Sequence, residues 1–303
     1  MTKNQKHNRR AWRNVVLLLL AALVLLVAAA LYYKPSWRYR LLAGIAVYAE
    51  PGVQLTEADG LALEGWTMED LQADERVSFD QSLLLVNSQY PIAEDFAADI
   101  VCYGDTDVQM NCCVTEAYRQ LAAEVLERFD EHLYIRSAYR TAEEQAETIE
   151  EDGDVAAPLN TSEHQVGLAL DVYVPYFAGM GFLDSEAGQY VNENCWQHGF
   201  IIRYPFYGVE ETGISYEPWH LRYVGAPHAE IISRNHLTLE GYIASLEAGV
   251  WYQYGSYLIS RQEGETLLLP EEFVSAVVSE DNLGGYIVTI LQPGPAAQTQ
   301  DSL

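Results

Sequence analysis

SEHQVGLALD, from Ser162 to Asp171, and EPWH, from Glu217 to His220, are the two segments of this sequence richest in chemical groups. They supply two imidazoles and several carboxylates. A catalytic zinc ion needs three protein ligands and a fourth position left open for water, and two histidines with one carboxylate meet that need. We therefore predict that His164, Asp171 and His220 bind zinc.

The second segment also offers a general base. A carboxylate beside the metal can take the proton from the attacking water and pass it to the leaving amine, and we assign this role to Glu217. Pro218 disfavours a helix here, so Glu217 and His220 are expected on a turn that leads into a strand. This arrangement differs from the helical H-E-x-x-H pattern of other zinc peptidases.

Around these segments the periodicity predicts an α+β domain. From Gly167 to Val174, aliphatic residues alternate with others, which is typical of a strand whose aliphatic side chains face away from Asp171. Three-and-four spacing predicts a helix over Thr115–Phe129, with Thr115 as its cap. We expect a small antiparallel sheet with flanking helices. The other expected elements are strands at Leu133–Ser137, Phe200–Tyr204 and Trp219–Val224, helices at Ala142–Ile149, Gly188–His198 and Leu239–Leu246, and β alternations at Tyr252–Ser260 and Tyr286–Leu291.

The N-terminus predicts a membrane anchor. An uncharged, Leu/Ala/Val-rich run extends from Val15 to Tyr33 and is about long enough to cross a bilayer. More positive charge precedes this run than follows it, which favours a cytoplasmic N-terminus and an exported body. A cleaved signal peptide is the alternative, since Ala28 to Ala30 offer small residues, but the apolar run is longer than a usual signal core. The basic residues before it are Lys3, Lys6, Arg9, Arg10 and Arg13.

The net charge of the chain limits the class of macromolecule that it can bind. Eight of the 17 Lys and Arg residues lie in the first forty positions, so the remainder carries nine basic against 44 acidic residues, a net charge of −35. A body this acidic repels nucleic acid, and we expect no nucleic-acid partner.

In an exported body the four cysteines could form disulfides in three pairings, or remain free buried thiols. They are Cys102, Cys112, Cys113 and Cys195.

Four ordered motifs resemble the VanY-type and LdcB-type D,D- and L,D-carboxypeptidases of peptidoglycan, zinc peptidases whose fold is shared with the hedgehog signalling domain. The resemblance runs from about Leu85 to Leu246, leaving the flanking segments outside it. The motifs are Leu85-Val86-Asn87, Ser137-Ala138-Tyr139-Arg140 with Gln145, the Ser162–Asp171 block, and Gly199–Pro205 followed by Glu217–Gly225.

The resemblance implies a role for each matching residue. It implies zinc ligands at His164, Asp171 and His220 and a catalytic base at Glu217. It also implies that Arg140 stabilises the developing oxyanion. The residues that would line the substrate pocket are Ser162, Gln145 and Trp219.

These observations predict a single-pass protein of the cell membrane with an extracellular peptidase that trims D-alanyl-D-alanine stem peptides of peptidoglycan. A cell-wall endopeptidase and a catalytically silent hedgehog-like binding module are the alternatives, and the intact Glu217 favours an enzyme. D,D against L,D specificity stays open. The expected division is a cytoplasmic segment 1–14, a transmembrane anchor 15–33, a stalk 34–78, a catalytic domain 79–248 and a C-terminal β appendage 249–303.

Overall fold

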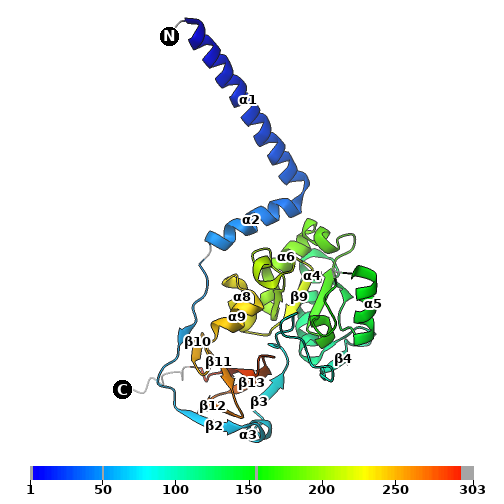
Figure 1. Cartoon of the computed structure of the whole chain (residues 1–303), viewed down its shortest axis with the longest axis vertical. Helices are drawn as coiled ribbons and strands as arrows, with labels where there is room; N and C mark the ends of the chain where they lie inside the picture. The colour runs from blue at the N-terminus through cyan, green and yellow to red at the C-terminus, as the bar shows by residue number, and fades with distance from the viewer. Residues whose placement is uncertain (1–2, 50, 154–155, 295–303) are drawn as a thin grey trace, which may run out of the picture.

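The computed structural model describes residues 3–49, 51–153 and 156–294. Helix α1 (Lys3–Tyr33) projects from the body, and α2 (Pro35–Ala49) turns from it onto the body (Figure 1). Within the described part, one helix is long and apolar enough to cross a membrane, Trp12–Tyr33, with mean hydropathy 3.0 and no burial against protein. Of the expected segment 1–14, residues 1–2 and the side chains of residues 3–11 lie outside the description.

A four-stranded antiparallel sheet carries the two motifs quoted first. Its strand order is β6-β7-β9-β8, so β7 and β9 are central. The predicted strands are confirmed with small shifts at their ends. They are β6 (Tyr134–Ser137), β7 (Ala169–Tyr173), β8 (Phe200–Ile202) and β9 (His220–Tyr223).

Helices pack around this sheet to form the first core. Helix α4 (Thr115–Phe129) has the predicted bounds and buries Tyr118, Leu121 and Val125 in that core. Thr115 is not its cap: a 3-10 turn, Cys112–Val114, precedes the helix, and Asn111 caps that turn instead. The other helices here are α5 (Ala142–Asp152), α6 (Glu186–Asn194), α7 (Val209–Thr212), α8 (His228–Arg234) and α9 (Leu239–Ser245).

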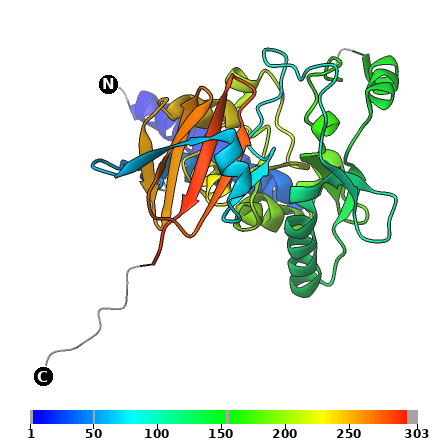
Figure 2. The ribbon, with the colours of Figure 1, turned by 90° about the horizontal axis from the view of Figure 1, so that it is seen from below.

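A six-stranded sheet joins the two flanks of the catalytic domain, in the order β1-β10-β11-β14-β13-β3. Figures 1 and 2 show the cyan strands from before the domain beside the orange and red strands from after it. The strands of this sheet are β1 (Thr56–Glu57), β3 (Val77–Asp80), β10 (Trp251–Tyr254), β11 (Tyr257–Glu263), β13 (Ser275–Glu280) and β14 (Gly285–Leu291). The remaining elements are α3 (Met68–Ala73) and the pairs β2 (Leu63–Thr67) with β12 (Thr266–Pro270) and β4 (Ile100–Cys102) with β5 (Gln109–Asn111).

The expected stalk 34–78 is therefore wrong as a free spacer. Its first part is the helix α2, and its second part supplies β1, β2 and the first half of β3 to the two sheets that these strands form with the C-terminal strands. Such short strands show little alternation of apolar and polar residues. The local sequence pattern therefore could not reveal that they pair with strands about two hundred residues later. The appendage 249–303 is thus one part of a larger β unit, and its residues 295–303 lie outside the description.

The buried segment 82–86 joins the two sheets. On one side the N–H of Leu83 donates to Ser279 Oγ and that of Leu85 to the carbonyl of Asp281. On the other side, Arg222 Nη2 donates to the carbonyls of Ser82 and Leu84. Segment 82–86 therefore forms hydrogen bonds with both the β unit and the four-stranded sheet, which we call the catalytic sheet. Apolar side chains also pack between the two.

Candidate active site

Two of the three expected metal ligands are a cross-strand pair. Asp171 on β7 lies directly opposite His220, the first residue of β9. Directly opposite residues of antiparallel strands bring their side chains within reach of each other. His164 joins them from the 3-10 turn Glu163–Val166 just before β7. The three ligand atoms lie within 4.8 Å of one another, so the structure brings together the set that the sequence predicted.

The orientation of His164 is fixed by a backbone acceptor. Its Nδ1 lies 2.7 Å from the carbonyl of Ala138, so Nδ1 carries the proton and Nε2 presents a lone pair toward Asp171 Oδ2, 3.5 Å away. Gly167 ends the turn with φ +67°, and a Cβ there would meet the N of Asn111 at 2.7 Å. Glycine at this position lets the turn lie against the neighbouring backbone while it aims His164 at the site.

His220 presents its other ring nitrogen. Its Nδ1 is 3.0 Å from Asp171 Oδ1, yet no donor among the described residues meets this buried oxygen in hydrogen-bonding geometry. Burial lowers the pKa of His220, but the carboxylates of Asp171 and Glu163 outweigh it and raise the pKa to about 9. A cation fits between these groups, because two nitrogen lone pairs and a carboxylate converge with an excess of negative charge.

Glu217 lies beside the triad on the expected turn, in which the N–H of His220 donates to the carbonyl of Glu217 at 3.1 Å. Its Oε2 is 3.7 Å from Nδ1 of His220, and its side chain is 28% exposed. Burial raises the pKa of Glu217, which the imidazole of His220 partly offsets. A carboxylate with a raised pKa beside a metal position is suited to general base catalysis.

The residues that we predict to contact the substrate differ in burial and in how they are connected to the metal ligands. Arg140 is tied to the ligand turn, since its backbone N–H donates to the carbonyl of His164 at 3.1 Å, and its side chain contacts Ser162 Oγ at 3.5 Å. Gln145 is fully buried and donates to the carbonyl of Ala157 at 2.7 Å. Trp219 is half-buried and packs against the core of the catalytic sheet. Their roles toward substrate stay predictions.

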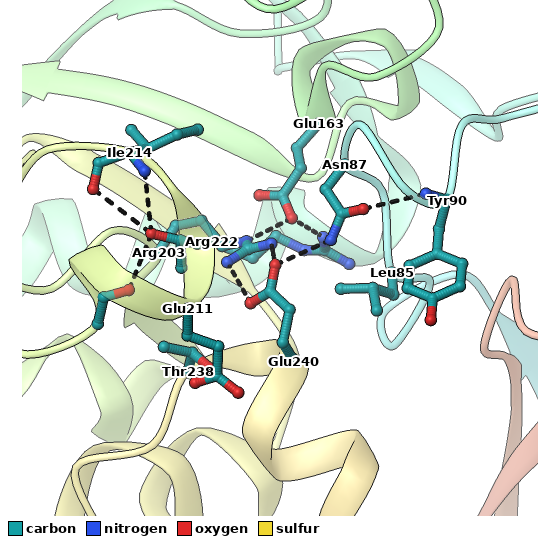
Figure 3. Close-up of polar contacts among 12 residues, drawn as sticks. Leu85, Asn87, Tyr90, Glu163, Arg203, Glu211, Ile214, Arg222, Thr238 and Glu240 are labelled. Carbon is teal, nitrogen blue, oxygen red and sulfur yellow. Dashed lines mark hydrogen bonds and ion pairs between the residues drawn. The ribbon is translucent and has the colours of Figure 1, made fainter.

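A buried ionic network that the sequence analysis missed is centred on Glu163, the residue before His164 (Figure 3). Glu163 Oε1 accepts from Arg203 Nε at 2.6 Å and from Arg222 Nη1 at 2.5 Å, and Arg203 also holds both oxygens of Glu240. Burial would raise the pKa of Glu163, but the two guanidinium groups outweigh it and hold the pKa well below its usual range. A sequence signal existed, because Arg222 lies within the predicted strand of β9 and Arg203 directly follows the apolar residues of β8, and arginines buried there require acidic partners.

The four cysteines are all free thiols, so the structure holds no disulfide at these positions. Cys195 is buried, and Cys102 and Cys112 are exposed. The structure therefore agrees with the alternative of free buried thiols in that all four are free, but of the four it buries only Cys195 fully.

Comparison with known proteins gives concordant matches. A family described as VanY, D-alanyl-D-alanine carboxypeptidase, matches residues 107–226. A D-alanyl-D-alanine carboxypeptidase of Enterococcus faecium is 33% identical over 254 residues, covering 75% of this chain and 80% of the relative. The bifunctional D-Ala-D-Ala dipeptidase and carboxypeptidase VanXYC of Enterococcus gallinarum is 33% identical over 184 residues, covering 53% of this chain and 93% of the relative.

A solved structure extends the likeness into the β unit. The D,D-dipeptidase VanXYg, in complex with a D-Ala-D-Ala phosphinate analogue, superposes with a TM-score of 0.61 at 25% identity and covers 77% of this chain and all of its own. Residues 79–248 are only 170 of 303 residues, so the match must include part of the flanking segments. The resemblance is therefore wider than the sequence motifs alone indicated.

Proposed function

This chain belongs to the VanY family of D-alanyl-D-alanine carboxypeptidases, and we propose that it is a zinc-dependent peptidase that removes the C-terminal D-amino acid from peptidoglycan stem peptides. The observation that carries the zinc proposal is the convergence of His164 Nε2, Asp171 and His220 Nδ1 within 4.8 Å. The carboxylates of Asp171 and Glu217 are partly exposed on one side of the three ligands. This leaves room for water and substrate, as a catalytic zinc site requires.

In this proposal each residue has one task. Zinc, when bound, polarises the scissile carbonyl and lowers the pKa of a water molecule. Glu217 takes the proton of the attacking water and delivers it to the leaving amine of the terminal D-amino acid. The guanidinium of Arg140 stabilises negative charge on the former carbonyl oxygen. Ser162, which contacts Arg140, would help to orient that guanidinium.

We also propose that α1 anchors the enzyme with its catalytic body outside the cell. The 22-residue apolar stretch Trp12–Tyr33 supports the anchor, and the basic residues before it support a cytoplasmic N-terminus. External protease on intact cells should then release the body and leave a small membrane-bound fragment. A mature protein that starts near Leu31 in untreated cells would instead indicate a cleaved signal peptide.

Digestion of a defined mixture of muropeptides, read by mass spectrometry, tests the activity. A carboxypeptidase releases single D-alanine residues from pentapeptide stems, whereas an endopeptidase separates cross-linked dimers. Cleavage only of tetrapeptide stems would indicate L,D specificity. Intact muropeptides after incubation with zinc-loaded protein would favour the silent binding module.

A further inference from the structure

Helix α2 has two opposite apolar faces, and the body covers only one. The inner face packs on the 3-10 segment Gly179–Asp184, where the N–H of Ser36 donates to Asp184 Oδ1 at 3.0 Å. Arg40 adds a cation–π contact with Tyr216 at 5.7 Å. A partly open cavity of about 910 Å³ lies between this face of α2 and the body.

The outer face of α2 is a stripe of large apolar side chains that are mostly exposed, although Trp37 and Leu41 border a shallow pocket with Phe206 of the body. Its members recur at helical spacing and are 52–93% exposed. They are Trp37, Leu41, Ile45 and Tyr48. A row of exposed apolar side chains along one face of a helix marks a surface that binds a protein partner or a membrane.

We infer that this outer stripe lies in the bilayer surface, so that α2 is held between the membrane and the catalytic body. The inference rests on the proposed anchor: α1 ends at Tyr33 and α2 begins at Pro35, so a spanning α1 leaves α2 at the lipid surface. Exposed Tyr32, Tyr33 and Trp37 mark the depth at which aromatic side chains favour the interface.

Charge favours a bilayer over a second copy of the chain. Helix α2 has no acidic residue, and Arg38 is free of the Tyr216 contact that Arg40 makes, so it suits anionic lipid headgroups. A second copy would bring two bodies of net charge −35 together at this face, whereas a bilayer that contains zwitterionic headgroups repels one such body less. The body is therefore held close to the membrane, where a stalk would have lifted it away.

Photocrosslinking of the full chain in vesicles of phosphatidylglycerol and phosphatidylethanolamine tests this surface. A benzophenone amino acid replaces Val24, Leu41, Ile45 or, as an exposed apolar control on the β unit, Leu268. We expect lipid adducts at Val24, Leu41 and Ile45 and none at Leu268. Turnover of a soluble D-alanyl-D-alanine peptide checks that each variant is folded.

The outcomes separate the two proposals. Lipid adducts at Val24 but not at Leu41 or Ile45 would overturn the surface and leave the anchor standing. No lipid adduct at Val24 would remove both. A chain-to-chain adduct at Ile45 would show that a second copy covers the stripe, which also overturns the inference.

A separate observation concerns Glu163, whose two carboxylate oxygens have different surroundings. Oε1 is held by both arginines, whereas Oε2 is buried and, among the described residues, has no hydrogen-bond partner. The same holds for Nε2 of His220, and these two atoms face each other at 3.8 Å.

We propose that Glu163 is a positioning residue that fixes the tautomer of His220. Nδ1 of His220 is the atom turned toward Asp171, so when it binds zinc the ring proton sits on Nε2, and among the described residues Oε2 of Glu163 is the carboxylate oxygen that faces this nitrogen. Metal-bound histidines commonly donate their other N–H to such a carboxylate, which orients the ring. The arginines hold Glu163 as an anion in place. This inference rests on the proposed zinc site.

Zinc affinity of Glu163→Gln tests the role, with Glu240→Gln as the matched control, because Glu240 shares Arg203 but lies away from His220. We expect about 10- to 100-fold weaker zinc binding for Glu163→Gln and near-normal binding for the control. Equal losses in both variants, or none in Glu163→Gln, would contradict the proposal.

A second measurement covers the case in which Glu163→Gln fails to fold. Nitrogen-15 NMR of the histidine rings in the zinc-loaded wild-type chain should show His220 with a proton on Nε2 and the metal at Nδ1. Metal at Nε2 would overturn the positioning role, whatever the variant does.

Discussion

The two sheets of this protein are built from the chain in opposite ways. All strands of the catalytic sheet lie between Tyr134 and Tyr223, whereas the six-stranded sheet takes its strands from before and after that interval. The first sheet holds the triad, and the second holds no residue assigned to chemistry. The difference shows that the residues of the candidate active site come from one compact interval of the sequence, whereas the sheet beside it forms by pairing of strands far apart in the sequence.

Metal removal should have the largest effect and should act on the catalytic sheet. Chelation is expected to abolish peptidase activity and zinc addition to restore it, since the bound metal is what activates the attacking water in the proposed mechanism. Activity assays with paired metal analysis check this. Full turnover by the metal-free chain would disprove the zinc proposal.

Glu217→Gln should separate catalysis from structure within the same sheet. The substitution keeps the volume but removes the basic carboxylate, so the rate should fall by about two to four orders of magnitude, with zinc content unchanged. Glu210→Gln, at an exposed acid of the nearby helix α7, is the control and should behave as wild type. Loss of zinc from Glu217→Gln would make Glu217 a ligand.

Ile290→Ala tests whether the six-stranded sheet acts only as a platform. Ile290 on β14 is fully buried in the core of the β unit, so its truncation should lower the free energy of unfolding by about 2–5 kcal/mol. Val274→Ala, at a half-exposed site, should be near neutral. Below its melting temperature Ile290→Ala should keep a normal kcat, and a reduced kcat there would show that the two sheets are functionally coupled.

His228 should give the interface a modest pH dependence. Its ring contacts the Tyr242 hydroxyl at 2.6 Å and Thr289 Oγ1 on β14 at 2.8 Å, and burial lowers its pKa to about 3. The folded state therefore binds this proton less readily than the unfolded chain does, so stability is complete above pH 6.5 and is lost as the pH falls below it. The slope is about 1.4 kcal/mol per pH unit.

Denaturant titrations between pH 7 and pH 5.5 measure this slope. His228→Gln should be less stable at pH 7 and should show a flatter profile over the same range. An unchanged profile in that variant would mean that other groups cause the acid sensitivity.

The sequence by itself determined the α+β catalytic domain and the triad with its neighbour Glu217. These residues sit in short motifs whose spacing reflects local geometry: a turn, a glycine with positive φ, and two adjacent antiparallel strands. Helix α4 was equally predictable, because its 15 residues make about four turns and show a clear apolar period.

Tertiary structure alone decided the remainder. Strands β1 to β3 are short and largely exposed on both faces, so their pairing with the C-terminal strands depends on contacts far away in sequence. The groups behind the histidine ligands were not visible in the motifs either: the Ala138 carbonyl accepts from His164, and the Glu163 carboxylate faces His220 at 3.8 Å. Ligand types follow from motif chemistry, but the atom that each ligand presents depends on what the folded chain places behind it.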